Sequence, residues 1–191
     1  MPDTLFSLAE EIRRCTSCPL YKNRMLAVPG EGGFAKRVMV VGEAPGAEED
    51  RMGLPFVGRS GKFLDAMLLV AGLNRGDVFV TGACKCRPPK NRTPSTREIT
   101  TCHDLWLVKQ IDILKPELIV VLGGVALKSL LGDSEYGGEE LKKLHGKLIA
   151  FNNLKYFVTY HPSAGMRFPL VRTMMKGDFE KLGRMLNAIT K

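Results

Sequence analysis

Cysteines at two unequal spacings are the residues of this chain best suited to binding a metal. Cys15 and Cys18 form a C-x2-C pair, whereas Cys86 and Cys102 lie far apart around a basic, proline-rich loop. A C-x2-C turn brings two thiolates to one site, and a second pair completes a four-thiolate shell. Because zinc ribbons commonly use two tight pairs, the wide second spacing favours a [4Fe–4S] cluster, with zinc as the alternative.

The remaining cysteine, Cys84, lies two residues before Cys86 and is expected to be a small core residue, with a ligand role still open. Disulfides or unrelated buried thiols are the other interpretation of the set. The odd number of cysteines, five, and the lack of a signal-peptide pattern argue against disulfides.

A glycine-rich and acidic turn, GEAPGAEED at residues 42–50, follows the first apolar run. Its glycines and proline expose backbone N–H groups, but it lacks the Lys-Ser/Thr of a P-loop, and its acids would repel a triphosphate. Carboxylates at such a place suit the orientation or deprotonation of a water molecule in a hydrolase. For Glu48 and Asp50, a solvated surface role is the better interpretation.

Two more side chains could act beside this turn. Phe56, in the loop LPFVGRSG, could stack on a planar base, although a core position is the alternative. His161, in the triplet HPS, could donate a hydrogen bond to a developing anion. The other histidines, His103 and His145, have no such context.

Length and composition predict one globular domain over residues 1–191. The chain is 45% hydrophobic and 25% charged, which is ordinary for a globular protein and excludes a disordered chain. No apolar stretch approaches the roughly 18 residues that span a bilayer, and the first residues, MPDTLFSLAEEIRRC, are typical of an amphipathic helix. We therefore expect a cytoplasmic protein with no membrane association.

The net charge of +8 favours a polyanionic partner, and nucleic acid is the first to consider. A run without acids, residues 85–97, carries much of this charge, on Lys85, Arg87, Lys90, Arg92 and Arg97. A solvated basic surface is the alternative.

Apolar runs rich in β-branched residues predict four buried parallel strands, at Val38–Val41, Val78–Thr81, Leu118–Leu122 and Tyr156–Tyr160. Helical patterns lie between and after them, at Gly61–Ala71, Thr96–Leu114, Val125–Leu131 and Asp178–Ile189. This alternation predicts an α/β fold with a central parallel sheet. Such sheets bind ligands beyond the carboxyl ends of their strands, so GEAPG, TGACKCRPP, LGG and HPS should converge there.

Taken together, C-x2-C, GEAPGAEED, PFVGRSG, KCRPPKNRTP with a later cysteine, and HPS resemble the uracil-DNA glycosylase superfamily, most closely its family 4, the thermostable iron–sulfur type. The motifs cover nearly the whole chain. The resemblance implies a three-layer α/β/α sandwich with a four-stranded parallel sheet. It also implies hydrolysis of the N-glycosidic bond of deaminated bases in DNA, during base excision repair, and a [4Fe–4S] cluster on Cys15, Cys18, Cys86 and Cys102.

The same resemblance assigns roles to single residues. Family positions linked to catalysis are matched by Glu43, Glu49, Asn91 and His161, the last being the histidine that holds O2 of the leaving uracil. Phe56 matches the aromatic that stacks on the base. Ala44 stands where family 1 has its water-activating aspartate. Whether Glu43 or Glu49 orients the water stays open.

The chain departs from the family pattern at Gly82. Family 4 typically reads TN-x-x-KC, and its asparagine pairs with the edge of uracil, whereas this chain reads TGACKC. Family 5 has a small residue there and a broader substrate range. We therefore expect weaker discrimination against hypoxanthine, or against thymine opposite guanine. The alternative is that the backbone or another side chain replaces the missing amide.

The expected partner is DNA, single- or double-stranded, that contains uracil or other deaminated bases, and the expected protein is a monomer. DNA contacts are expected from Lys85, Arg87, Arg92 and Ser163. One alternative function is an iron–sulfur DNA-binding protein of the glycosylase fold without base release. A hydrolase of free nucleotides is disfavoured by the basic loop and the missing P-loop.

Overall fold

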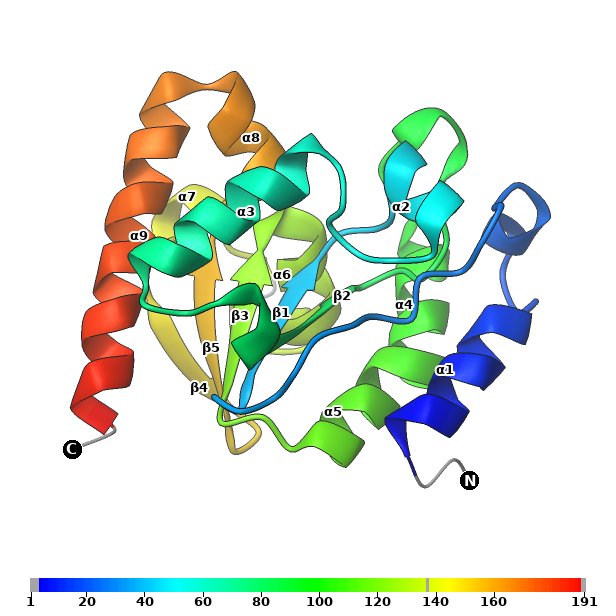
Figure 1. The fold of residues 1–191 in the computed structure, drawn as a ribbon, viewed down its shortest axis with the longest axis horizontal. Coiled ribbons are helices and arrows are strands. Elements are labelled where there is room, and N and C mark those ends of the chain that lie inside the picture. The colour runs from blue at the N-terminus through cyan, green and yellow to red at the C-terminus, as the bar shows by residue number, and fades with distance from the viewer. Residues whose placement is uncertain (1–3, 137, 190–191) are drawn as a thin grey trace.

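A five-stranded sheet forms the centre of the protein, with strand order β2-β1-β3-β5-β4 (Figure 1). The strands are β1 (Val38–Gly42), β2 (Val78–Gly82), β3 (Leu118–Leu122), β4 (Leu148–Phe151) and β5 (Leu154–Thr159). All neighbours pair in parallel except β4, which is antiparallel to β5. The computed structural model describes residues 4–136 and 138–189, so the first three residues of the predicted N-terminal helix lie outside it.

The α-helices are α1 (Leu5–Arg14), α2 (Ala47–Met52), α3 (Arg59–Val70), α4 (Thr96–Cys102), α5 (Val108–Leu114), α6 (Gly123–Leu131), α7 (Leu141–Leu144), α8 (Pro162–Arg167) and α9 (Pro169–Ile189). Short 3-10 turns lie at η1 (Pro19–Lys22), η2 (Arg75–Asp77) and η3 (Pro89–Asn91), and a π-helical segment, η4 (His103–Leu107), joins α4 to α5.

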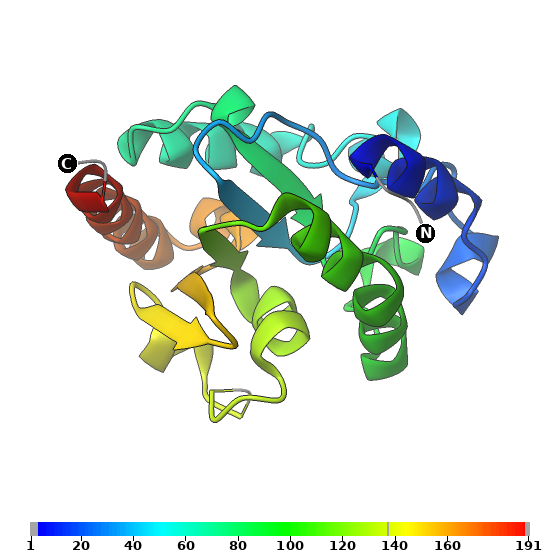
Figure 2. The ribbon, with the colours of Figure 1, turned by 90° about the horizontal axis from the view of Figure 1, so that it is seen from below.

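The sheet is buried on both faces because helices cover each of them. Successive side chains of a strand point to opposite sides and so pack against different helices. In β1, Val38 and Val40 pack with the residues of α3 and α9, whereas Met39 and Val41 pack with those of α6. Figure 2 shows α9 on one side of the strands and α6 on the other. The predicted three-layer α/β/α architecture is therefore confirmed.

The four predicted strands are all present, with ends that differ by at most two residues, but the sheet has five strands rather than four. The additional strand, β4, forms a hairpin with β5. Its turn consists of Asn152 and Asn153, which have φ angles of 47° and 61°. Both lie in the left-handed region that asparagine tolerates better than most residues, so this pair closes a tight antiparallel turn.

Two predicted helices differ from the structure by more than a two-residue shift of an end. The last helix begins at Pro169 rather than at Asp178, with proline in the first turn, where its missing N–H costs nothing. The predicted helix Thr96–Leu114 is present but widens into the π-helical segment η4. This segment carries Trp106, whose indole reaches the N-terminal cysteines.

The order of the strands places a crevice at the carboxyl edge of the sheet. The chain passes from β1 to its neighbour β2 and then crosses back to β3, on the other side of β1. Such a change of direction separates the loops that follow neighbouring strands and leaves room for a ligand. Among the described residues, no helix is both long and apolar enough to cross a membrane.

Candidate active site

A pocket of about 260 Å³ opens at this carboxyl edge. Segments that follow β1, β2 and β5 form it, together with Val28, which precedes β1. The LGG turn after β3, which the sequence predicted at the same place, does not line the pocket. Residues that the sequence predicted for the site and that line the pocket are Glu43, Ala44, Glu49, Phe56, Gly82, Asn91, Arg92, His161 and Ser163. The structure therefore brings together residues from distant parts of the chain. The predicted residues that do not line it are Lys85, Arg87 and the four cysteines.

His161 offers a hydrogen-bond donor to the pocket. It caps the N-terminus of α8, where the backbone N–H of Ser163 donates to its Nδ1 at 3.3 Å, and the Ser163 hydroxyl lies 2.8 Å from the same atom. Because Nδ1 accepts, the neutral ring carries its proton on Nε2. Burial lowers the pKa of His161 to about 4, against a weaker opposing effect of Glu49. The imidazole is therefore neutral at pH 7.

Phe56 is held in an unusual backbone conformation. Its φ is 51°, in the left-handed region, which costs a non-glycine residue about 1–3 kcal/mol. The ring lies over Gly42 at the end of β1, so closely that a Cβ added there would stand 2.4 Å from Phe56 Cζ. Its centroid is 5.8 Å from that of His161. Phe56 and His161 are thus neighbouring walls of one pocket.

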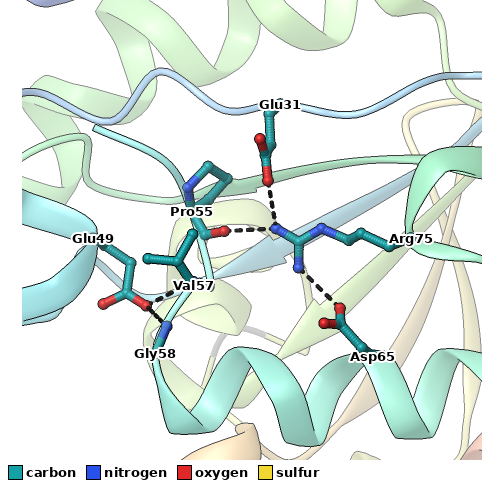
Figure 3. A network of polar contacts seen from close by, with 7 residues as sticks. All are labelled: Glu31, Glu49, Pro55, Val57, Gly58, Asp65 and Arg75. Atoms are coloured by element: carbon teal, nitrogen blue, oxygen red, sulfur yellow. Dashed lines mark hydrogen bonds and ion pairs between the residues drawn. The ribbon is translucent and has the colours of Figure 1, made fainter. Parts of the chain in front are cut away.

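Glu49 is a buried carboxylate whose oxygens are occupied by the backbone. Its Oε1 accepts from the N–H groups of Val57 and Gly58, both at 2.9 Å, and its Oε2 accepts from that of Gly46 at 3.1 Å. Figure 3 shows the two bonds to the loop that carries Phe56. The side chain is only 8% exposed. Glu49 therefore fastens this loop to α2, and little of its hydrogen-bonding capacity remains for a water.

Glu43, unlike Glu49, has a carboxylate without hydrogen-bond partners among the described residues. It lines the pocket and is half-buried, and its carboxylate makes no hydrogen bond or ion pair with the described residues. Burial raises the pKa of Glu43 above its usual range. A carboxylate that is free of protein partners and partly desolvated is suited to accept a proton from a bound water.

The basic loop contributes an amide to the pocket. Asn91 follows Lys90 in η3, and both have a φ of 54°. The Nε of Arg87 donates to Asn91 Oδ1 at 2.7 Å, so the side-chain NH₂ of Asn91 remains available. Arg92 lines the pocket, but its guanidinium makes a bidentate contact with the buried Glu98 and lowers the pKa of that carboxyl to about 2.

Lys85 does not lie where the sequence predicted. Its side chain is 1% exposed, and its Nζ donates to Thr81 Oγ1, to the carbonyl of Gly82 and to Gln110 Oε1, at 2.7, 2.7 and 2.6 Å. Burial lowers the pKa of Lys85 to about 8. The ammonium ties the end of β2 to α5, so the predicted phosphate contact at Lys85 does not agree with the structure.

The four predicted ligand cysteines lie in one apolar cluster with α1 and η4. Their sulfurs accept hydrogen bonds that the sequence did not predict: Arg24 Nη1 donates to Cys86 at 3.0 Å, Trp106 Nε1 to Cys15 at 3.3 Å, and the Lys85 N–H to Cys102 at 3.3 Å. Donors of this kind stabilise sulfur as thiolate. Among the described residues, no group of three or more His, Cys, Asp or Glu side chains is arranged to hold a metal ion.

Cys84 is 1% exposed, as expected of a core residue. A hydrogen bond with Cys102 raises the pKa of the Cys84 thiol and lowers that of Cys102. Cys84 therefore stays protonated as a donor, while Cys102 is the thiol that ionises. Neither Arg24 nor Trp106 belongs to a recognisable motif, and only the position of Trp106 four residues after Cys102 could have indicated contact with the cysteines.

Comparison with known proteins identifies relatives over nearly the whole chain. The uracil DNA glycosylase superfamily matches residues 29–183. A type-4 uracil-DNA glycosylase of Pyrobaculum aerophilum is 45% identical, over 93% of this chain and 90% of its own length. A type-4 uracil-DNA glycosylase of Saccharolobus solfataricus is 40% identical over 97% and 88%. A type-5 uracil-DNA glycosylase of Pyrobaculum aerophilum is 34% identical over 71% and 65%.

Proposed function

Because the chain belongs to the uracil-DNA glycosylase superfamily, we propose that it releases uracil from DNA by hydrolysing the N-glycosidic bond, as a monofunctional enzyme of base excision repair. One observation carries this proposal: a stacking aromatic, a neutral histidine donor and a half-buried carboxylate meet in one pocket. We further propose that the chain works as a single-domain monomer in the cytoplasm.

The pocket receives the target base after the nucleotide has turned out of the stack. Phe56 offers its ring to one face of the base, and aromatic stacking contributes about 1–3 kcal/mol per base. Because the Phe56 loop is fixed to α2 by Glu49, the ring is in place before the base arrives.

His161 stabilises the leaving base. When the bond between sugar and base breaks, negative charge develops on the uracil oxygen, and the Nε2–H of the neutral imidazole donates to it. A donor placed in this way contributes about 3–4 kcal/mol to the transition state. The bond from Ser163 to Nδ1 supports this role because it fixes the tautomer.

Glu43 orients the attacking water, and Glu49 is a positioning residue. The carboxylate of Glu43 is free to accept a proton, whereas the oxygens of Glu49 accept three backbone N–H groups. The sequence left this choice open, and the difference in hydrogen bonding supports Glu43. Asn91 supplies its NH₂ group to the same site, and Ala44 leaves room where family 1 carries a carboxylate.

The exposed part of the basic loop and the start of α8 bind the DNA backbone. Arg87 and Arg92 flank the pocket, and Lys90 between them is exposed. Ser163 lies at the opposite wall beside His161. Lys85 is not part of this interface because its ammonium is buried. The partner is uracil-containing DNA, in single or double strands.

Cys15, Cys18, Cys86 and Cys102 hold a [4Fe–4S] cluster. The four thiolates would be the ligands of the cluster, which would serve as a structural group. The apolar surroundings and the N–H donors from Arg24 and Trp106 suit four negatively charged sulfurs. The hydrolysis needs no electron transfer, and the cluster supplies a structural cross-link between α1 and the basic loop.

Gly82 broadens the range of bases. Gly82 lines the pocket, a Cβ added there would stand 2.8 Å from the Cys84 carbonyl oxygen, and glycine has no side chain to reach a base. A side-chain amide that reads the base edge is therefore absent here, and the loss of such a pair costs about 1–3 kcal/mol of discrimination. We expect uracil to be released along with other deaminated or mispaired bases.

Single-turnover release from a panel of oligonucleotides tests the function. The panel contains uracil in single strands, opposite guanine and opposite adenine, hypoxanthine opposite thymine, and thymine opposite guanine, and His161→Ala serves as the control. Uracil release that the control lacks is the expected result. Release of uracil alone contradicts the role of Gly82, and DNA binding without any release supports an inactive binding protein instead.

A further inference from the structure

Arg75 lies outside the pocket and outside every sequence motif discussed above, yet its guanidinium contacts the loop of Phe56. It belongs to η2, immediately before β2. Its Nη2 donates to the Pro55 carbonyl at 2.6 Å, one residue before Phe56 (Figure 3). The side chain is 23% exposed, which is low for an arginine.

Two carboxylates hold this guanidinium in place. Glu31 Oε1 lies 3.0 Å from Nη2, and Asp65 Oδ1 lies 3.2 Å from Nη1. Both are on fixed parts of the fold: Glu31 exchanges two backbone hydrogen bonds with Val80 of β2, and Asp65 is in α3. The guanidinium therefore fixes the Pro55 carbonyl relative to the sheet and to a helix.

Phe56 is thus held from both sides. On one side, Arg75 binds the carbonyl of Pro55, and on the other side, Glu49 binds the N–H groups of Val57 and Gly58. Figure 3 shows both sets of contacts around the same short loop. A left-handed φ at a bulky residue persists only when its surroundings impose it, and these two clamps do so.

We propose that Arg75 is a positioning residue of the glycosylase: it holds the Phe56 loop in the conformation that presents the ring to the extruded base. This inference rests on the proposed function and deepens it. Without the guanidinium, Phe56 relaxes from its left-handed conformation, and the ring leaves its place over Gly42 beside His161. The base is then stacked less well when the bond breaks.

A double-mutant cycle with Phe56 tests this mechanism. Single-turnover uracil release from a single-stranded oligonucleotide is measured for wild type, Arg75→Met, Phe56→Ala and the double variant, well below the melting temperature of each. We expect Arg75→Met to lower the rate about tenfold, within the range of one stacking contact. In the Phe56→Ala background the same change should cost less than about threefold, because the two residues act as one unit. An equal loss in both backgrounds overturns the proposal.

Amide hydrogen exchange of the segment 54–61 gives a readout that does not depend on activity. In Arg75→Met, the amides of Val57 and Gly58 should exchange faster while the sheet remains protected. The matched control is Arg37→Met, which removes an ion pair to Glu117 and a bond to the Lys115 carbonyl, neither of which involves the segment 54–61. Unchanged exchange in the segment overturns the clamp.

Arg75→Lys is the second variant and covers the case in which Arg75→Met does not fold. It keeps one donor, so its rate and exchange should lie between those of wild type and Arg75→Met. If Arg75→Lys is as stable as wild type but has the same rate and the same amide exchange as Arg75→Met, the proposed role of the contact with the Pro55 carbonyl is contradicted. A wild type that releases no uracil refutes the proposed function, whereas the exchange data still decide whether Arg75 clamps the loop.

Discussion

At the level of single residues, His161 and Glu43 must both be deprotonated, and burial shifts their pKa values in opposite directions. The proposed mechanism needs His161 neutral and Glu43 ionised. Burial lowers the pKa of His161 to about 4 and raises that of Glu43. As the pH falls, Glu43 therefore takes up its proton first. We expect uracil release to decline on the acid side with a midpoint above the usual pKa of glutamate, measured as the single-turnover rate against pH.

The Glu43→Gln protein is the control for this assignment. Its residual activity should lack the Glu43 titration and should fall only near pH 4, where His161 becomes protonated. An acid limb near the ordinary histidine pKa of about 6.5 in both proteins would contradict a buried, neutral His161.

Substitution of Glu43 should mainly lower the reaction rate, whereas substitution of Glu49 should mainly lower the stability of the fold. Glu43→Gln should lower the single-turnover rate by about a hundredfold or more, the scale of general base catalysis, with little change in melting temperature. Glu49→Gln should lower the free energy of unfolding by about 2–3 kcal/mol, because hydrogen bonds to a charged acceptor are lost. Thermal melts and rates of both variants check this, and a stable Glu49→Gln protein without activity would instead make Glu49 the base.

Single residues also show how much of the candidate site could be predicted from the sequence. Apart from Val28, the residues that line the pocket come after β1, β2 or β5, so their convergence could be predicted from the topology of parallel sheets. Lys85 could not, because its partners Thr81 and Gln110 become neighbours only when β2 packs near α5. A lysine in a run of basic residues is expected to be exposed. The sequence does not indicate which oxygens will accept hydrogen bonds from its ammonium and so compensate for its burial.

At the level of elements, the loop of residues 85–97 should set the affinity for DNA. Arg87→Ala and Lys90→Ala should each weaken binding of all sequences and reduce the slope of log K against log salt by about 0.7–0.9 per lost phosphate contact. Lys155→Ala is the matched control, since Lys155 is an exposed lysine at the opposite edge of the sheet. Fluorescence titrations over a salt series measure the slopes, and equal slopes for all three variants would remove the loop from the interface.

Parallel strands were easier to predict than the edge of the sheet. A buried parallel strand is a short, uninterrupted apolar run, and such runs stand out at β1, β2 and β3. β4 is shorter and exposes alternate residues, and it is recognisable only through the Asn152-Asn153 turn that follows it. The π-helical segment η4 has the same apolar spacing as its flanking helices, so no periodicity could distinguish it.

At the scale of the whole molecule, the cysteines connect parts that the sheet does not hold. α1 lies beside α5 (Figure 1) and touches the remainder of the fold mainly through this helix and the cysteine cluster. The basic loop runs between Cys86 and Cys102. A cross-link at this place joins the N-terminal segment to the loop proposed to bind DNA. The proposed cluster should therefore affect the DNA interface and the stability of the N-terminal segment more than the chemistry in the pocket.

Substitution of single cysteines can test that division of roles. Cys15→Ser should abolish the visible absorption of the cluster, lower the iron content and reduce the melting temperature, because a ligand is lost. Cys84→Ser should retain iron, since Cys84 serves as a buried donor to Cys102. Free uracil should still inhibit or bind the Cys15→Ser protein below its melting temperature, because the pocket is formed by strand ends that do not include α1. If Cys84→Ser loses iron and Cys15→Ser keeps it, Cys84 rather than Cys15 is the ligand. If Cys15→Ser no longer binds uracil, the cluster contributes to the shape of the pocket.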